Sequence, residues 1–266
     1  MPDIKQLRTR IRSVQSTLHL THAMQLVASS KIRRASERME LSAEHAGAFQ
    51  TAMDILTSSG ACAGSPWLAQ RAEGKDLLVV IAGDRGLAGG YNANVFRLMR
   101  AYPEAEVIPL GKRACDRYGQ PPVLVEPYTA QQADSLPRTL CERFAAGGYR
   151  RVGIVYTRYV SILSQVADVR WVLPLAVPAE AQKYDMIFEP DPRAILEAAV
   201  PAYVGGVLSA CARESFACEV CARRNAMDSA GKNAREMIDD LQLQYNRARQ
   251  GAITQEITEI VAGGGA

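Results

Sequence analysis

The hydrophobic residues at both ends of the chain recur every three or four positions, a spacing typical of helices that wind around one another. Near the N-terminus these positions are Ile4, Leu7, Ile11, Val14 and Leu18. Near the C-terminus they are Met237, Leu241, Tyr245, Ala248 and Ala252, followed by Ile253, Ile257 and Ile260. No proline interrupts residues 3–65 or 202–266. We therefore predict two long terminal helices, within residues 1–58 and 192–266, that pair as an antiparallel coiled coil.

Between these ends, short apolar runs alternate with helical patterns. Residues 76–82 and 151–157 are continuous hydrophobic runs with the length of a buried strand. Further strands are predicted at 106–110, 123–125, 165–175 and 186–188. One helix is predicted to begin at a cap on Asn92 or Asn94 and to end at Arg100, and two more are predicted at 112–118 and 130–146. Asp191-Pro192 is expected to open the C-terminal helix. Strands alternating with helices indicate an α/β domain at residues 59–191, with a mostly parallel sheet covered on both faces.

Charge and cysteine content narrow the function classes. The net charge is +3, but residues 5–38 contain eight Lys or Arg and one acidic residue, Glu37. An acidic protein surface or a nucleic acid would complement this segment, and a solvated helix face is the alternative. The six cysteines lack the spacing of a disulfide framework, and the CxxC pair Cys218 and Cys221 lacks the second pair that zinc needs. No apolar run approaches bilayer length, so we expect a cytoplasmic chain that binds membranes only peripherally.

A glycine-rich turn, Gly83–Gly90, follows the first buried strand, which is where α/β proteins bind phosphates. It does not match GxGxxG, the chain has no GxxxxGK followed by Ser or Thr, and Asp84 would repel a phosphate. A turn of small residues that lets a helix pack closely is therefore favoured. No histidine stands at the end of a candidate strand, so we predict no catalytic residues, metal or cofactor.

Three segments resemble a known family. Residues 20–35 (LTHAMQLVASSKIRRA), 84–94 (DRGLAGGYNAN) and 241–261 (LQLQYNRARQGAITQEITEIV) are similar to the signatures of the γ subunits of F-type ATP synthases. The resemblance implies a coiled coil of the two ends with a Rossmann-like α/β domain between them. It also implies a central stalk without a catalytic site, which couples proton-driven rotation of a c ring to ATP synthesis or hydrolysis at β subunits.

The same resemblance implies partners and contact residues. The partners are an α3β3 hexamer, an ε subunit and the c ring, with no nucleic acid, at the cytoplasmic side of a bacterial plasma membrane. The residues expected to contact the α3β3 ring are Met24, Lys31, Arg33, Arg34, Arg223, Arg249, Gln250, Thr254 and Glu259. The chain departs from the family pattern at Arg224, where a Met is common, and at Gly231-Lys232, where Thr-Asp is typical. A dinucleotide-binding α/β enzyme and a basic coiled-coil nucleic-acid-binding protein remain the alternatives, although neither accounts for both terminal signatures.

Overall fold

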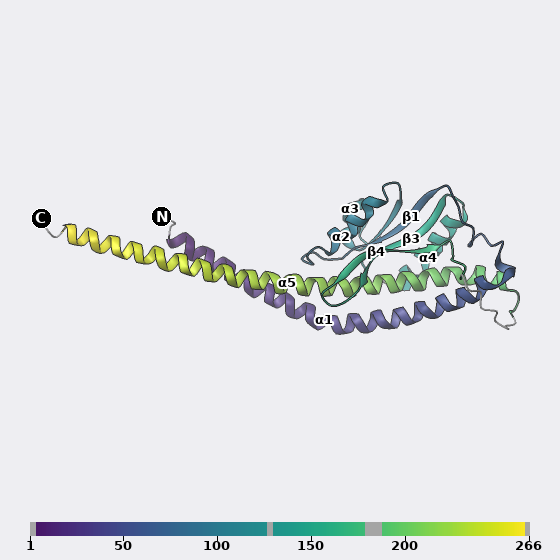
Figure 1. The fold of residues 1–266 in the computed structure, drawn as a ribbon, viewed down its shortest axis with the longest axis horizontal. Coiled ribbons are helices and arrows are strands. Elements are labelled where there is room, and N and C mark those ends of the chain that lie inside the picture. The colour runs from purple at the N-terminus through teal and green to yellow at the C-terminus, as the bar shows by residue number, and fades with distance from the viewer. Residues whose placement is uncertain (1–3, 127–129, 179–187, 264–266) are drawn as a thin grey trace. The chain divides into compact units, whose positions relative to one another are not determined.

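The computed structural model describes residues 4–126, 130–178 and 188–263, in which an α/β region separates two long terminal helices along the chain (Figure 1). The elements are α1 (Ile4–Ser58), η1 (Gly60–Cys62), β1 (Lys75–Ile81), α2 (Tyr91–Leu98), η2 (Met99–Ala101), β2 (Glu106–Leu110), α3 (Lys112–Tyr118), α4 (Ala130–Ala145), β3 (Tyr149–Tyr159), β4 (Gln165–Leu173) and α5 (Pro192–Gly263). The chain forms two compact units: a helical unit of Met1–Ser29 and Arg223–Ala266, and an α/β unit of Ser30–Ala222.

In the helical unit, α1 and α5 pair in opposite directions. Gln25 is hydrogen-bonded to Asp228, and a side chain at Gly231 would touch Thr21. Residue numbers therefore increase along α5 in the direction in which they decrease along α1. Within this unit, the buried positions of α5 recur every three or four residues: Met227, Gly231, Ala234, Ile238 and Leu241. The predicted antiparallel coiled coil is therefore confirmed.

The prediction that Met237 faces the partner helix is wrong. Met237 is 44% exposed, whereas Ile238 beside it is only 9% exposed. The reason is the spacing, because Ile238 lies four residues after Ala234 and three before Leu241, and both of these are buried. Met237 belongs to the neighbouring, more exposed face of the helix.

The α/β unit contains one four-stranded sheet in the order β2-β1-β3-β4. Strand β1 runs parallel to both neighbours, with Val79 opposite Ile108 of β2 and Ile154 of β3. Strand β4 is antiparallel to β3, because residues 160–164 form a hairpin connection that is too short for a parallel crossover. The predicted mostly parallel sheet is confirmed, with one antiparallel edge strand.

Both faces of this sheet are buried, which explains why its central strands are hydrophobic throughout. Leu77 and Val79 of β1 face a core completed by side chains of α1, α4 and α5, while Leu78 and Val80 on the opposite face pack with residues of α2. Helix α1 also packs on α5 within this unit: the Phe49 ring would be 3.0 Å from a side chain added at Gly206. The glycine in α5 thus permits this close helix contact.

Local details of the α/β unit differ from prediction in three places. Residues 123–125 form no strand, because the Val123 amide bonds to the Cys115 sulfur and the Val125 amide to the Asp84 side chain instead of to a neighbouring strand. Helix α2 begins after Gly90 rather than at an asparagine cap. The strand predicted at 186–188 falls outside the described residues except for Phe188, which is in no strand.

The start of α5 agrees with prediction. Asp191 caps this helix, accepting hydrogen bonds from the backbone amides of Arg193 and Ala194 at 2.9 and 3.0 Å. Such a cap satisfies two of the amides that have no partner within the helix.

Hydrophobicity along α5 exceeds what the sequence patterns led us to expect. Among the described residues, α5 is the one helix with an 18-residue stretch apolar enough to cross a bilayer by length and composition, with a mean hydropathy of 1.6. The expectation that no such stretch exists is therefore wrong. Half of the stretch is buried within the protein, where Leu196, Val204 and Leu208 pack into the core beside the sheet. Core packing accounts for this composition.

Candidate functional site: a glycine-rich turn occupied by a helix carboxylate

The glycine-rich turn after β1 holds an anion that belongs to the chain itself. The backbone amides of Asp84 and Arg85 each donate a hydrogen bond of 3.3 Å to the carboxylate of Glu219, which projects from α5 and is 2% exposed. A side chain at Gly83 would lie 2.8 Å from the Glu219 Cδ atom. The position where an α/β protein would hold a phosphate is therefore filled by a carboxylate.

The Asp84 side chain connects this turn to the start of α3 and to the loop around Val125. Its carboxylate accepts hydrogen bonds from the amides of Lys112 at 3.2 Å, Val125 at 2.9 Å and Glu126 at 2.8 Å. The Asn92 side chain, in turn, accepts a 2.8 Å hydrogen bond from the Gly83 amide. Asp84 thus ties the turn to two neighbouring segments, and Asn92 of α2 bonds to the first amide of the turn.

Two further residues of α5 bond close to this turn, at the end of β3 and at Tyr91 of α2. The Ser215 hydroxyl accepts a hydrogen bond from the Thr157 amide at 3.1 Å, and its carbonyl accepts one from the Tyr91 hydroxyl at 2.9 Å. Glu214 accepts a 2.8 Å hydrogen bond from the Tyr159 amide. Burial raises the pKa of Tyr91 well above its usual range, with the nearby Glu219 acting in the same direction, so this phenol stays protonated and remains a donor.

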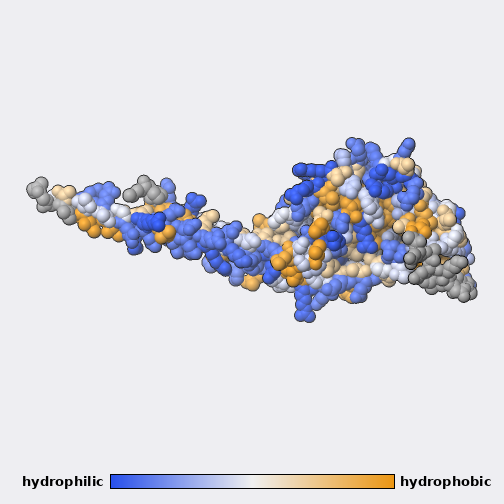
Figure 2. Space-filling view, viewed as in Figure 1, coloured by the Kyte–Doolittle hydropathy of each residue, from blue (hydrophilic) through white to orange (hydrophobic). Residues whose placement is uncertain are grey.

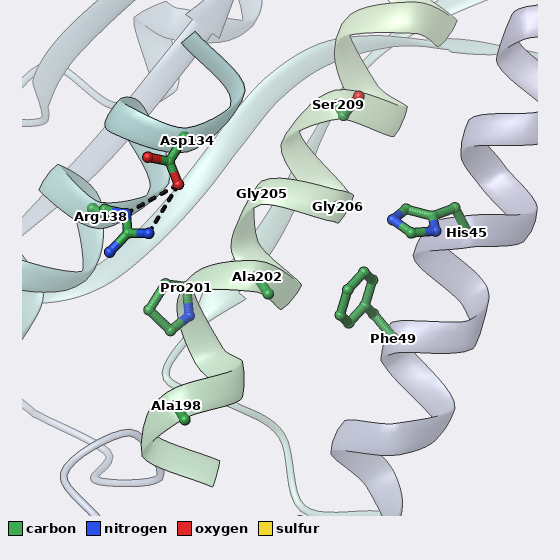
Figure 3. A pocket seen from close by; sticks show the side chains of 10 residues that line it. All are labelled: His45, Phe49, Asp134, Arg138, Ala198, Pro201, Ala202, Gly205, Gly206 and Ser209. Carbon is green, nitrogen blue, oxygen red and sulfur yellow. Dashed lines mark hydrogen bonds and ion pairs between the residues drawn. The ribbon is translucent and has the colours of Figure 1, made fainter. Parts of the chain in front are cut away.

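A separate cavity of about 430 Å³ lies among α1, α4 and α5 (Figure 3). The imidazole of His45 meets the ring of Phe49 edge-on at 4.9 Å, and Asp134 pairs with Arg138 at 3.0 Å. The other lining residues are small, namely Ala198, Pro201, Ala202, Gly205, Gly206 and Ser209. The cavity thus has the character of a packing gap, since its acidic and basic groups are engaged with neighbours.

The cysteines have no reactive geometry. All six lie within the described residues, are buried and form no disulfide. Burial raises the pKa of Cys141 and of Cys211 to about 12 and shifts Cys218 in the same direction, so these thiols stay protonated. Within the part of the chain that the structure describes, no three His, Cys, Asp or Glu side chains are grouped as metal ligands would be.

Three of the expected ring-contact residues belong to the α/β unit, on α1. Lys31 forms an ion pair with Glu126, which also lies 3.5 Å from a guanidinium nitrogen of Arg85. Arg33 is exposed and pairs with Glu37 one turn later at 2.9 Å. Arg34 is exposed. The basic segment thus presents charge to solvent, with Lys31 partly neutralised by the chain itself.

The other six expected contact residues belong to the helical unit. Met24 and Arg223 are half-buried, whereas Arg249, Gln250, Thr254 and Glu259 are exposed along the last turns of α5. The Thr254 hydroxyl bonds back to the Gln250 carbonyl at 2.9 Å, and Glu259 accepts a hydrogen bond from Gln255 at 3.0 Å. These residues are spread along two helices and converge on no pocket.

Sequence reasoning missed Glu219, the residue of α5 whose carboxylate occupies the turn. A local signal was present, because Glu219 is a lone carboxylate among Cys218, Val220 and Cys221 on an otherwise apolar stretch of helix. A buried carboxylate in such a setting requires hydrogen-bond donors from another element. The partner amides lie about 135 residues earlier in the chain, so the sequence alone did not indicate which donors they are.

The fold and this turn define an α/β protein with coiled-coil ends whose usual phosphate position is filled internally. The family model described as ATP synthase matches residues 3–266. The chain is 41% identical over 281 residues to the ATP synthase gamma chain of Ruminococcus albus, covering 98% of this chain and 97% of that one. It is 39% identical over 277 residues to the gamma chain of Moorella thermoacetica, covering 99% and 98%. The chain therefore belongs to the ATP synthase gamma chain family, as its three signatures indicated.

Solved structures support the same fold at much lower identity. A chain of the Euglena gracilis mitochondrial ATP synthase superposes with a TM-score of 0.69 at 18% identity, covering 98% of this chain and 93% of that one. A chain from the central stalk and c ring of the Tetrahymena thermophila mitochondrial ATP synthase superposes with a TM-score of 0.63 at 19% identity, covering 79% of this chain and 99% of that one. The predicted architecture of terminal helices around an α/β region is thus shared with these chains.

Proposed function

We propose that this chain is the rotary central-stalk γ subunit of an F-type ATP synthase, coupling rotation of a c ring to ATP synthesis or hydrolysis at β subunits. The observation that carries the proposal is its 41% identity, over nearly the full length of both chains, to a bacterial ATP synthase gamma chain. The related Euglena chain belongs to a structure described as the rotor of its ATP synthase in rotational state 1. A chain with both an antiparallel coiled coil and an α/β unit suits the same task.

The coupling follows from conformational free energy. An asymmetric stalk inside a ring of three α and three β subunits favours a different β conformation at each angle. Rotation therefore changes the nucleotide affinity of each catalytic site in turn, and mechanical work becomes a shift in binding free energy. Because the linkage is reciprocal, hydrolysis at β drives the stalk in the opposite direction.

The two helices supply the surfaces that would turn against the ring. We assign its contacts to the residues expected from the family resemblance: Met24, Lys31, Arg33, Arg34, Arg223, Arg249, Gln250, Thr254 and Glu259. Near the C-terminal end of α5, Ile253, Ile257 and Ile260 are 46%, 57% and 72% exposed, and hydrophobic residues are visible there in Figure 2. An apolar end suits rotation in a hydrophobic collar, since few fixed hydrogen bonds would oppose it.

The remaining assignments follow the family. Catalysis would reside on the β subunits, and the γ chain would need no cofactor. Residues 59–191 would dock with ε on the c ring, while residues 1–58 and 192–266 would form the stalk. The complex would lie at the cytoplasmic face of a bacterial plasma membrane and be driven by protons, with this chain bound only through its partners.

Of the two alternatives, the dinucleotide-binding enzyme is the one that the contacts of the glycine-rich turn disfavour. The Glu219 carboxylate engages the amides that a phosphate would need, and a nucleotide would have to displace it. Equilibrium dialysis of the pure chain with ATP is expected to give no micromolar binding. Tight binding would favour the enzyme, whereas nuclease-sensitive recovery with nucleic acid and a steep loss of affinity with salt would favour the basic coiled-coil alternative.

Copurification tests the proposed function. The tagged chain is expressed in its own host, detergent-solubilised membranes are passed over the affinity resin, and bound proteins are identified by mass. Expected partners are the α, β, ε and c subunits in nuclease-treated as well as untreated samples, with an untagged strain as control. Recovery of the chain alone would contradict the proposal.

A further inference from the structure

Three neighbouring side chains of α5 attach this helix to the end of β3 and to the turn after β1. Glu214, Ser215 and Glu219 lie within two turns, and each accepts a hydrogen bond from a backbone amide of the α/β unit at 2.8 to 3.3 Å. Ser215 and Glu219 are almost wholly buried, at 0% and 2% exposed. The amides of Thr157 and Tyr159 belong to β3, and those of Asp84 and Arg85 belong to the turn after β1, so these contacts fix α5 to the backbone of the sheet and of this turn rather than to mobile side chains.

Of the two carboxylates in this group, Glu219 is the one that is almost wholly buried, and its surroundings favour an anion. Successive amides at a glycine-rich turn after a strand form a concave site that favours an anion. Here Asp84 and Arg85 supply those amides. The missing side chain at Gly83 provides the room, because an added Cβ atom would come within 2.8 Å of the carboxyl carbon.

The energetic consequence is a strong preference for one register. A buried carboxylate is tolerated while donors are aimed at it, and becomes costly when they are removed. Sliding or rotating α5 against the sheet would withdraw the Glu219 carboxylate from both amides. Of the contacts in this group, the one made by Glu219 therefore resists slippage most.

We propose that Glu219 is the positioning residue that transmits torque between the α/β unit and α5, by holding its carboxylate in the amides of the glycine-rich turn. The inference rests on the proposed function, in which the α/β unit follows the c ring and α5 acts on the β subunits. Helix α5 is continuous from Pro192 to Gly263, so rotation imposed at Glu219 is carried along the helix. Loosening this contact lets α5 turn under ATP hydrolysis without driving the c ring fully.

The test uses the complete ATP synthase reconstituted into liposomes, with ATP hydrolysis and proton pumping measured on the same preparation. Glu219→Gln keeps the shape of the side chain but removes the charge. Gly83→Ala leaves Glu219 intact and displaces its carboxylate from the opposite side. Glu197→Gln is the matched control, because it makes the same change at an exposed position of α5 in the same unit.

Both contact variants are expected to retain most ATP hydrolysis while protons pumped per ATP fall severalfold, and the control should match the wild type. Glu219→Asp, which keeps the charge but shortens the reach, should fall between Glu219→Gln and the wild type. Equal loss of hydrolysis and pumping in both contact variants would overturn the inference in favour of a general folding role. Unchanged pumping in both would overturn it as well.

A spectroscopic measurement separates this inference from the proposed function. In the full chain labelled with ¹⁵N-aspartate and ¹⁵N-arginine, the amide signals of Asp84 and Arg85 should shift upfield in Glu219→Gln and stay in place in Glu197→Gln. Unmoved signals would contradict the contact directly. Failure of the wild-type chain to join α and β subunits would instead count against the proposed function, whatever these amides show.

Discussion

The side-chain amide of Gln25 donates a 2.9 Å hydrogen bond to the carboxylate of Asp228, joining α1 to α5 within the helical unit. Lys232, one turn further along α5, pairs with the same carboxylate at 2.8 Å. The hydrogen bond from Lys232 lowers the pKa of Asp228, and the bond from Gln25 acts in the same direction. The lysine at 232, where the family typically has an aspartate, thus has a defined partner in this chain.

A charge reversal tests that relationship. Lys232→Asp would place two carboxylates one helical turn apart beside Gln25, which destabilises a helix through like-charge repulsion. We expect the thermal midpoint of the full chain to fall by about 2 °C. The swapped variant Asp228→Lys with Lys232→Asp should recover most of the ion pair. A double variant less stable than Lys232→Asp alone would show that the Gln25 hydrogen bond, rather than the charge pair, dominates.

A second prediction concerns the buried carboxylate at the start of β1. Asp76 is 7% exposed and accepts hydrogen bonds from the guanidinium groups of Arg150 and Arg151, with charge pairs at 3.1 and 2.7 Å. Asp76→Asn should lower the free energy of unfolding by about 3 kcal/mol at neutral pH, because two arginines lose their counter-ion. Urea denaturation of the full chain measures this loss. Asp134→Asn, in an exposed pair, should cost under about 0.5 kcal/mol.

The pH dependence of this difference has a definite sign. Burial raises the pKa of Asp76, but the hydrogen bonds from Arg151 and Arg150 outweigh it and hold the pKa below its ordinary value. Its contribution is therefore present above the unfolded pKa of about 4 and lost as pH falls through the folded pKa. The wild type and Asp76→Asn should accordingly converge in stability below about pH 4. A difference that stays constant down to pH 3 would contradict the ion pair as its cause.

The carboxylate of Asp84 gives a third prediction. Because it accepts three backbone hydrogen bonds from Lys112, Val125 and Glu126, Asp84→Ala leaves those amides without their acceptor. We expect the unfolding free energy to fall by about 2 kcal/mol. Hydrogen exchange of the Val125 and Glu126 amides should also accelerate. Asp116→Ala, which removes an exposed carboxylate from the neighbouring α3, is the control and should change neither quantity appreciably.

A fourth prediction separates the C-terminal tip from the folded core. Residues from Ile253 to Ile260 are exposed, so we expect deletion of Ile260–Ala266 to have little effect on the stability of the fold. The thermal midpoint and helicity of the isolated chain should remain nearly unchanged. Assembly with α and β should also survive, since Arg249, Gln250 and Thr254 precede the deletion. A fall of several degrees in the midpoint would mean that the tip packs against its own chain.

The sequence-based prediction was accurate where structure depends on local patterns, and it failed where structure depends on contacts between residues in different segments of the chain. Hydrophobic periodicity located α1, α5 and the four strands because each element displays its own burial pattern. The segment 123–125 was misassigned because the Val125 amide bonds to the Asp84 side chain and the Val123 amide to the Cys115 sulfur, contacts that apolar spacing does not encode. The α2 cap was misassigned for a related reason, since the Asn92 side chain accepts a hydrogen bond from the Gly83 amide.

The site was less predictable than the fold. The glycine-rich turn was located and its phosphate role disfavoured on account of Asp84, yet the structure gives a different reason. Glu219 fills the turn, whereas Asp84 binds the adjacent loop. The residues assigned to the α3β3 ring stay predictions, because what they contact belongs to other chains.

Single-molecule rotation tests the central claim most directly. Leu163 at the β3–β4 hairpin is 80% exposed while all six native cysteines are buried, so Leu163→Cys gives a unique attachment point for a bead. The labelled chain is assembled with α and β subunits fixed to a surface, and ATP is added. We predict ATP-dependent rotation in one direction with three dwell positions per turn, one for each β subunit. A bead that stays still on an assembled complex hydrolysing ATP would contradict the assignment of this chain as the rotor.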